Sequence, residues 1–286
     1  MSPTGLCASA ALAQNTAMSA QEAVVPTSFD TATRMIAYEQ PLNERMRSIL
    51  RLDFLYQQAV HHHTKADPWS TRAAVDSLLE ILAITARGDV RSEVLKELER
   101  QMAQLSAFAA RPGVDTSRLR MLLTKLHRLR EDLGSIGALF MQKLRDSEFL
   151  NAIKHRSTIP GGTCEFDLPD YTHWLNQPDE VRGADFAHWL GVIRPLGDAV
   201  SELLWITREQ ARTKFEVARG GVYQLTFDRD VPMQLVRILL PAGTDLYPEI
   251  SGSHYRCSIR FLLWHDPSTR AVQTTEDVRF QLASCS

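Results

Sequence analysis

The stretch VARGGVYQLTFD, residues 217–228, marks the point where the spacing of the apolar residues changes. From about Asp179 to Val217, apolar side chains recur at the interval expected of a helix. Beyond the two glycines, Gly220 and Gly221, apolar and polar residues alternate, which is typical of a strand with one buried face. The stretch therefore predicts a helical part followed by strands.

Three more segments near the C-terminus have the pattern of strands. Residues Tyr255–Leu263 and Val278–Leu282 alternate between apolar and polar, and Leu235–Leu240 form a more continuous apolar run. In the first of these, we expect the odd-numbered side chains, from Tyr255 onward, to face the core. Two upstream segments, residues 34–39 and 164–168, are candidates for additional strands in the same sheet.

Residues 42–156 have the pattern of several antiparallel helices. An apolar stripe at helical spacing runs through Val94, Leu98, Met102 and Leu105. Glu97 and the charged residues around it lie largely off this stripe. Pro68, Asp89 and either Asp115 or Ser117 are suited to helix starts, because proline fits the first turn and the side chains of aspartate and serine cap free backbone amides. The segment is predicted to be a helical body.

The two patterns together predict an α+β protein. A mainly helical bundle domain is expected over residues 34–218, and a smaller antiparallel β domain over residues 219–286. Residues 1–33 show neither pattern. Their piece CASAALAQ, residues 7–14, is only faintly similar to a secretory leader, because no Lys or Arg precedes Arg34. We interpret this segment as a disordered extension, or as an over-long gene start upstream of Met18 or Met35.

The composition is that of an ordinary globular protein. The chain has 286 residues, of which 44% are hydrophobic and 23% charged, and a net charge of -2. No apolar run approaches the roughly 20 residues of a membrane-spanning helix, so we expect no membrane association. The four cysteines are too scattered for a disulfide framework or a CxxC zinc site, and we expect reduced thiols in the cytoplasm.

Charge is distributed unevenly along the chain. Residues 42–156 carry 19 basic and 14 acidic side chains, a net of +5, whereas residues 157–218 carry 5 and 10, a net of -5. A basic block inside a nearly neutral protein can present a basic face to an acidic partner, although solvated helix faces are the more common explanation of such a block taken alone.

The sequence contains none of the common nucleotide-binding or hydrolase motifs. The run His61–His63 does not predict a metal site, because consecutive residues of a helix point about 100° apart. We therefore predict no catalytic residue, no metal and no cofactor.

Two pairs of arginines carry more information. Arg47 and Arg51 are four residues apart and so share a helix face, where like charges repel unless an anion or solvent relieves them. Arg256 and Arg260 share one face of a predicted strand, about 13 Å apart at roughly 3.3 Å per residue. Their face is opposite the predicted core face, so both should point outward or into a groove, where guanidinium groups are suited to binding carboxylates.

Five blocks of the chain resemble, in the same order, the ZapD family of bacterial cell division proteins. These blocks are Glu39–Phe54, Arg87–Arg100, Pro112–Arg118, Ser157–Pro169 and Leu246–Phe261. The similarity runs from about residue 35 to the end of the chain. It implies a cytoplasmic, non-enzymatic factor at the mid-cell division ring. Members of the family are homodimers that bind the C-terminal tail of the tubulin-like GTPase FtsZ, bundle its protofilaments and are associated with reduced GTPase activity.

The resemblance also implies a binding surface, a basic pocket between the helical and β parts. Matched by motif, its candidates are Arg47, Arg87, Arg256 and Arg260, to which Arg51 is added because it shares a helix face with Arg47. A further basic position of the family falls on Glu148 here, and Arg145 is a candidate to replace it.

Two other functions remain open at this point. The basic helical region is compatible with a nucleic-acid-binding module, but the sheet lacks interleaved basic and aromatic residues and no helix-turn-helix pattern is present. An enzyme of unknown class would need convergent titratable groups, and the sequence indicates none. Nucleic acid is therefore not expected as a partner.

Overall fold

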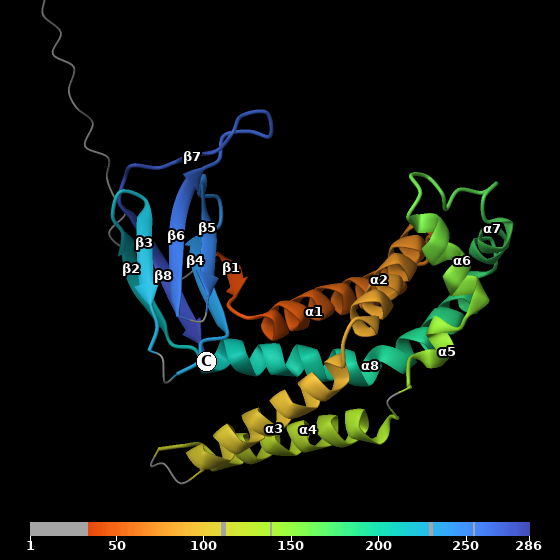
Figure 1. Cartoon of the computed structure of the whole chain (residues 1–286), viewed down its shortest axis with the longest axis horizontal. Coiled ribbons are helices and arrows are strands. Elements are labelled where there is room, and N and C mark those ends of the chain that lie inside the picture. The colour runs from red at the N-terminus through yellow and green to blue at the C-terminus, as the bar shows by residue number, and fades with distance from the viewer. Residues whose placement is uncertain (1–33, 110–112, 138, 229–230, 254) are drawn as a thin grey trace, which may run out of the picture. The chain divides into compact units, whose positions relative to one another are not determined.

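The computed structural model describes residues 34–109, 113–137, 139–228, 231–253 and 255–286 (Figure 1). The chain divides by compactness into Met1–Arg34 and Met35–Ser286, and the second unit contains all the elements described below. The extension expected over residues 1–33 lies outside the described residues.

A helical body and two antiparallel sheets make up the second unit, so the predicted α+β class is confirmed. The helices are α1 (Glu44–His63), α2 (Pro68–Ala86), α3 (Val90–Phe108), α4 (Thr116–Ser135), α5 (Gln142–Arg145), α6 (Glu148–Ser157), α7 (Pro169–Leu175) and α8 (Asp179–Gln210). The strands are β1 (Met35–Pro41), β2 (Thr213–Ala218), β3 (Val222–Thr226), β4 (Leu235–Pro241), β5 (Leu246–Ser253), β6 (Arg256–Leu263), β7 (Val272–Gln273) and β8 (Val278–Cys285).

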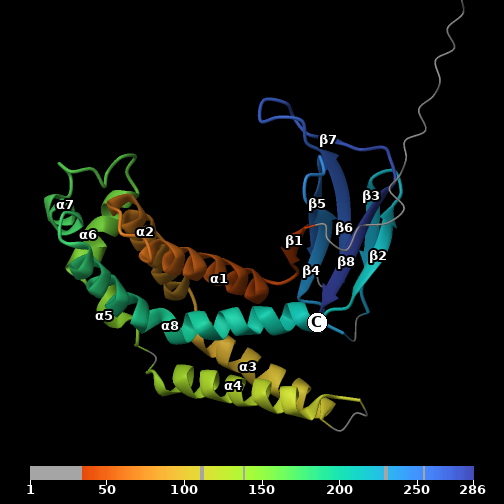
Figure 2. The ribbon, with the colours of Figure 1, turned by 180° about the vertical axis from the view of Figure 1, so that it is seen from behind.

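The helices begin where the sequence predicts. Pro68 occupies the first turn of α2. The side chains of Asp89 and Asp115 accept hydrogen bonds from backbone amides at the starts of α3 and α4. The long helix α8 lies between α1 and the α3–α4 hairpin in both face views (Figures 1 and 2). Its buried face, which includes Leu203 and Leu204, joins the core of the helical body.

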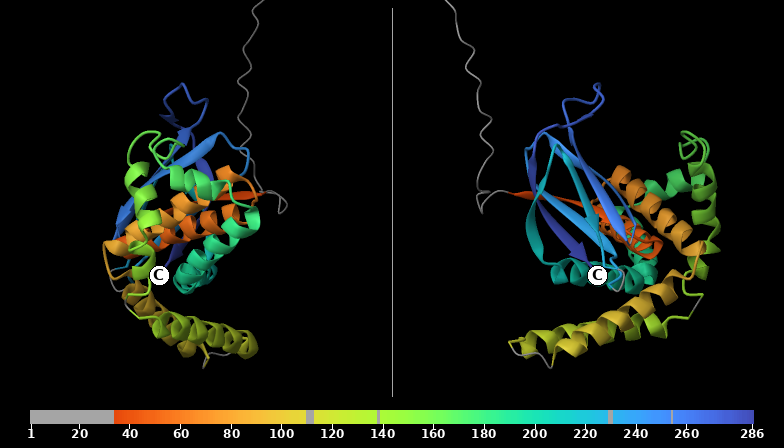
Figure 3. Two further views of the ribbon diagram at one scale, coloured as in Figure 1. Left: turned by 90° about the vertical axis from the view of Figure 1, so that its right-hand side faces the viewer. Right: turned by 60° about the vertical axis from the view of Figure 1, so that its left-hand side comes forward.

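The strands form two sheets that pack on one shared core. One sheet has the order β1-β4-β8-β2, and the other has the order β3-β6-β5 with β7 paired to β6. Phe280 of the first sheet contacts Phe261 of the second, with ring centroids 5.0 Å apart. The inner faces of both sheets meet there, and the sheets lie face to face (Figure 3).

Three local expectations are wrong. Helix α8 ends at Gln210 rather than near Val217, because residues 213–218 pair with β8 as strand β2. Residues 164–168 form turns and no strand, since the amides of Asp167 and Leu168 both bond back to the carbonyl of Cys164. Tyr255 is 51% exposed and lies just before β6, so it does not face the core.

The first sheet takes strands from both ends of the helical segment. Strand β1 precedes α1 and pairs with β4, and β2 follows α8 and pairs with β8. Of these two strands, β1 confirms the additional strand expected over residues 34–39, whereas β2 comes from residues that the sequence assigned to the last helix. The domain boundary at residue 218 stays a prediction.

Two carboxylates connect elements that are distant in the sequence. Glu39 of β1 accepts hydrogen bonds from Arg208 of α8, at 2.7 and 2.9 Å, and from Arg237 of β4, at 2.8 Å. Glu97 of α3 is 2% exposed and lies 3.4 Å from a guanidinium nitrogen of Arg45 on α1. These contacts fix the start of α1 and the end of α8 against the sheet.

Glu97 lies off the apolar stripe of α3, as expected, and is nevertheless buried. Its carboxylate accepts hydrogen bonds from Arg100 at 2.6 Å and from the buried Gln101 and Gln234 at 3.4 Å. Its burial results from tertiary packing against the segment before β4, which helical periodicity does not report.

Replacing Leu98 by alanine tests the core of the helical body. Leu98 is 0% exposed on α3, so the truncation removes buried methyl groups and leaves a cavity. We expect the free energy of unfolding to fall by roughly 2 to 5 kcal/mol. Urea denaturation measures the change, and Leu139→Ala, at a side chain that is 72% exposed, is the matched control. Equal effects of the two substitutions would contradict the assigned packing.

Candidate functional site

Arg256 and Arg260 lie on the outward face of β6. The alternate residues Cys257, Ile259 and Phe261 are at most 3% exposed and face the core shared by the two sheets. Because successive side chains of a strand point to opposite faces, the two arginines are held away from this core. Both are exposed, as the sequence predicted.

A hollow of about 610 Å³ lies next to Arg256 on the same sheet. It is formed by parts of β3, β5 and β6, and its lining is largely polar. The residues that line it are Gln224, Leu225, Thr226, Ser251, Gly252, Ser253, Arg256, Cys257 and Ser258. Among the described residues, the guanidinium of Arg256 has no ion-pair partner. The hollow thus offers one uncommitted cation among hydroxyl groups, which suits a carboxylate flanked by other polar groups.

Arg260 differs from Arg256 because it has a local partner. It pairs in register with Glu249 of the neighbouring strand β5, and the two side chains form an ion pair. Both side chains are about half exposed, at 55% and 52%. Solvent screens such a pair strongly, so Glu249 competes only weakly for the guanidinium of Arg260.

The residue that precedes the cap of α1 packs into the core shared by the two sheets. A Cβ atom added to Gly252 of β5 would be only 3.0 Å from Cδ2 of Leu42, the residue before the cap of α1. Gly252 pairs with the core-facing Cys257, so this contact lies on the inner face of β5, opposite the side of Arg256 and Arg260. Arg47 follows in the first turns of α1, where its Nε donates to Glu44 at 3.1 Å.

Arg51 is exposed one turn beyond Arg47, and the apolar side chain of Phe54 is 66% exposed three residues later. On a helix these three positions lie along one side. The exposed side of α1 therefore combines two cations with a large apolar group, which is the composition needed to bind a segment with both acidic and apolar residues.

Arg87 and Arg145 form a second group at the end of α2. Arg87 is the C-terminal cap residue of α2 and is exposed. Nη2 of Arg145 donates to the carbonyl of Thr85 at 2.8 Å and to its hydroxyl at 3.2 Å. The guanidinium of Arg145 is thereby used to cap α2, while Glu148 lies exposed in the first turn of α6.

The six arginines fall into three sets, on α1, on β6 and at the end of α2. No hydrogen bond or ion pair between described residues connects one of these sets with another. The binding role predicted for Arg145 stays a prediction, and its geometry favours a structural role. Sequence reasoning missed Glu249 and Phe54. The partner of Arg260 depends on strand register, which the sequence alone does not give, and a single apolar residue on a polar helix face forms no recognisable motif.

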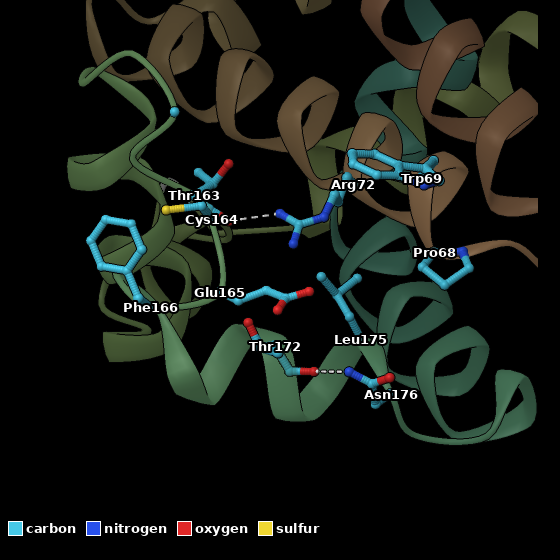
Figure 4. A pocket seen from close by; sticks show the side chains of 11 residues that line it. Pro68, Trp69, Arg72, Thr163, Cys164, Glu165, Phe166, Thr172, Leu175 and Asn176 are labelled. Atoms are coloured by element: carbon cyan, nitrogen blue, oxygen red, sulfur yellow. Dashed lines mark hydrogen bonds between the residues drawn. The ribbon is translucent and has the colours of Figure 1, made fainter.

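A larger pocket of about 780 Å³ lies elsewhere, between α2, α7 and the turns before α7 (Figure 4). Arg72 lies beside it, with its guanidinium 5.7 Å from the ring centroid of Trp69 and 4.9 Å from that of Tyr171. It also donates to the carbonyl of Thr163 at 2.8 Å. None of the six arginines lines this pocket.

Neither a metal site at the histidine run nor a thiolate at Cys257 or Cys285 is found in the described part of the chain. The ring of His63 packs on Phe186 at 5.2 Å, and no group of His, Cys, Asp or Glu in the described part of the chain is suited to a metal ion. Burial raises the pKa of the Cys257 and Cys285 thiols to about 11, so both stay protonated near neutral pH. Every described helix is too short or too polar to cross a bilayer.

Comparison with known proteins shows which family the chain is similar to. The family "ZapD: Cell division protein" matches residues 50–260. A Cell division protein ZapD of Chromobacterium violaceum is 37% identical over 251 residues, which are 88% of this chain and 99% of the relative. That of Methylococcus capsulatus is 36% identical over 250 residues, 87% of this chain and 98% of the relative. That of Azoarcus sp. (strain BH72) is 34% identical over 254 residues, 88% of this chain and all of the relative. The chain therefore belongs to the ZapD family of cell division proteins.

Proposed function

We propose that this protein binds the C-terminal tail of FtsZ and, as a homodimer, cross-links FtsZ protofilaments in the division ring. The observation that carries the proposal is the outward pair Arg256 and Arg260 on β6, of which Arg256 lines a polar hollow. Membership of a cell division family supports the choice of partner.

The chemistry of the surface fits a short acidic and apolar peptide. Arg256 would bind a carboxylate of the tail, and the hydroxyl groups of the hollow would accept or donate further hydrogen bonds. Arg47 and Arg51 extend the positive potential along α1, and Phe54 provides apolar contact area. Binding of this kind needs no covalent step, so we propose a non-enzymatic role.

Cross-linking follows from valency. A homodimer presents two tail sites, and a polymer of FtsZ presents many tails. Once one site is occupied, the second binds at a high effective concentration, so weak single contacts hold filaments together. We infer that the protein acts in the cytoplasm at mid-cell and that reduced GTPase activity accompanies bundling.

Co-sedimentation of the full chain with FtsZ polymers tests the proposal. The expected result is bundling of intact FtsZ by the protein and no bundling of FtsZ that lacks its tail. A gel-shift assay on duplex DNA forms the second arm. Binding to DNA, together with failure to pellet with FtsZ, would overturn the proposal in favour of a nucleic-acid-binding module.

Salt should weaken tail binding steeply. Ion pairs between exposed groups are screened within a Debye length of about 8 Å at physiological ionic strength and about 3 Å at 1 M. We expect the dissociation constant of a labelled FtsZ tail peptide, measured by fluorescence anisotropy, to rise at least tenfold between low and high salt. An affinity that does not change with salt would show that the arginines are not the main contacts.

Removing the local competitor of Arg260 should strengthen binding. Glu249→Gln releases the guanidinium of Arg260 and removes a negative charge from the surface. We expect the tail peptide to bind about twofold to fivefold more tightly, because an exposed ion pair is worth only ~0.2–1 kcal/mol. The matched control is Glu276→Gln at an exposed glutamate outside the hollow. Equal affinity of the two variants would remove Arg260 from the proposed site.

A further inference from the structure

The outward face of β6 changes from polar to apolar along the strand. Arg256, Ser258 and Arg260 share this face with Leu262, because side chains two residues apart on a strand point to the same side. The alternate side chains of the strand fill the core that the two sheets share. The face therefore begins with cations and reaches an apolar side chain near its end.

Trp264 continues this face beyond the end of β6. Its backbone amide donates to the carbonyl of Asp245 at 2.7 Å, which extends the pairing of β5 with β6 by one residue. Its ring lies edge-on to the ring of Tyr247, with centroids 6.5 Å apart. Tyr247 pairs in register with Leu262, so these side chains lie on the outward side of the sheet. We call Tyr247, Leu262 and Trp264 the aromatic end of the face.

Solvent reaches the aromatic end. Trp264 is 48% exposed, and the side chains of Tyr247 and Leu262 are half-buried. The core rings on the inner side of the sheets, such as Phe261, are in contrast fully buried. Aromatic side chains beside polar groups are typical of binding surfaces, because they provide large contact areas at a low cost in conformational entropy.

The charges of this face are separated along the strand. Arg256 has no ion-pair partner among the described residues, and Arg260 pairs with the exposed Glu249. At the aromatic end, Asp245 is exposed in the position paired with Trp264. Like charges repel, so a carboxylate of a ligand is attracted to the Arg256 end of the face and repelled from the Trp264 end.

Uncharged polar side chains lie between the two arginines. Gln224 of β3 and Ser251 of β5 are both in register with Ser258 of β6, the strand between them (Figure 1). All three border the hollow, and amide and hydroxyl groups can bond to the backbone of a peptide laid over them. From Arg256 to Trp264 the face is about 26 Å long at roughly 3.3 Å per residue, the length of about eight extended residues.

We propose that the aromatic end binds the apolar residues of the same peptide whose carboxylates bind Arg256 and Arg260, so that an extended peptide lies along β6. This inference rests on the proposed tail binding and goes further, because it names the side chains that recognise the apolar part of the ligand. Such a ligand has acidic residues at one end and a large apolar side chain about four to eight residues away. A ligand with interleaved acidic and apolar residues binds less well, since one carboxylate would lie beside Asp245.

Four labelled peptides of about nine residues test the proposal on the full chain by fluorescence anisotropy. The segregated peptide has two aspartates at one end, a spacer of serine and glycine, and a leucine and a phenylalanine at the other end. In the acidic-only peptide, serines replace the two apolar residues. In the third peptide, asparagines replace the aspartates, and in the fourth one aspartate is moved next to the phenylalanine. We expect the segregated peptide to bind at least fivefold more tightly than each of the others.

A matched pair of tryptophans locates the apolar contact. Trp264→Ala should weaken binding of the segregated peptide at least fivefold and change binding of the acidic-only peptide less than twofold. Trp264→Phe should keep most of the affinity, because it retains an aromatic ring. The control is Trp69→Ala, at a tryptophan that is 80% exposed on α2, and it should change neither affinity. Circular dichroism checks that all the variants are folded.

Three results would overturn the proposal. They are equal affinities of the segregated peptide and the peptide with the moved aspartate, equal weakening of binding by Trp69→Ala, and equal weakening of both the segregated and the acidic-only peptides by Trp264→Ala. The last result would mean that Trp264 supports the sheet and does not contact the apolar residues.

The FtsZ tail peptide separates failure of this inference from failure of the proposed function. If tail binding is lost with Arg256→Glu but unchanged with Trp264→Ala, the aromatic end is not part of the site and the proposed function stands. If the tail does not bind while the segregated peptide binds and depends on Trp264, the proposed function fails and the aromatic end is confirmed for another acidic and apolar peptide.

Discussion

Replacing Arg256 and Arg260 together by glutamate is expected to abolish FtsZ bundling and to leave the protein folded. Both side chains are exposed on the outward face of β6, while the core side of the strand is unaltered. Each charge-assisted hydrogen bond contributes about 1.5 to 3 kcal/mol, so the loss of two should weaken tail binding about a hundredfold or more. Co-sedimentation and peptide anisotropy measure the two effects.

The matched control carries the same change of charge at other sites. Arg212→Glu with Arg270→Glu also lowers the net charge by four, at two exposed arginines that do not line the hollow. This control should bundle FtsZ nearly as well as the wild type. Equal loss of bundling in the control would mean that overall charge, and not the β6 surface, governs the interaction.

Folding of the double variant needs its own measurement. The carboxylate introduced at position 260 would lie opposite Glu249, and like charges across a strand pair cost roughly 0.2 to 1 kcal/mol. We expect a small fall in the thermal midpoint and an unchanged circular dichroism spectrum. An unfolded variant would show that the arginines support the sheet, and normal bundling would show that the binding surface lies elsewhere.

The strand face of the arginines was predictable because it depends only on period two. Once Cys257, Ile259 and Phe261 are assigned to the core, Arg256 and Arg260 must point the other way. The surroundings of the arginines were not predictable. The pairing of Arg260 with Glu249 depends on the register between β6 and β5, and the close approach of Leu42 to Gly252 depends on tertiary packing.

The helical patterns were similarly informative about local structure and uninformative about long-range partners. Aspartate caps and an N-terminal proline predicted helix starts, because capping acts within one turn. The same kind of reasoning extended α8 too far, since strand β2 is held by pairing with β8, which is distant in sequence. Arg145 illustrates the limit for function, because only the structure shows its guanidinium on the end of α2.

Replacing Glu97 by alanine is expected to cause a large loss of stability. The carboxylate is 2% exposed and is contacted by Arg45, Arg100, Gln101 and Gln234. Its removal leaves two guanidinium groups, which are 37% and 30% exposed, without their counter-charge and two buried amides without their acceptor. Because solvent reaches the arginines, we expect a loss of about 1 to 3 kcal/mol in urea denaturation, below the cost of breaking a fully buried pair.

Glu99→Ala is the matched control on the same helix. Glu99 is 53% exposed and pairs with Arg130 at 3.0 Å, so its loss should cost less than about 1 kcal/mol. The loss of stability caused by Glu97→Gln should lie between those of the two alanine variants, because an amide keeps one acceptor oxygen but loses the charge. Equal stability of the Glu97→Ala and Glu99→Ala variants would contradict the burial of this carboxylate.

The Glu97 substitution should also weaken tail binding in the molecules that remain folded. Arg45 is two residues before Arg47 on α1, and Gln234 directly precedes β4, so Glu97 holds the start of α1 against the first sheet. Loss of this contact frees the first turns of α1 to shift relative to the hollow on β6. The affinity for the tail peptide should therefore fall with Glu97→Ala when it is measured under conditions in which the protein is still folded. It should stay unchanged with Leu98→Ala, because this substitution destabilises the same helix but removes no charged contact with α1. If the two variants bound the peptide equally well, the surface on β6 would be sufficient without α1.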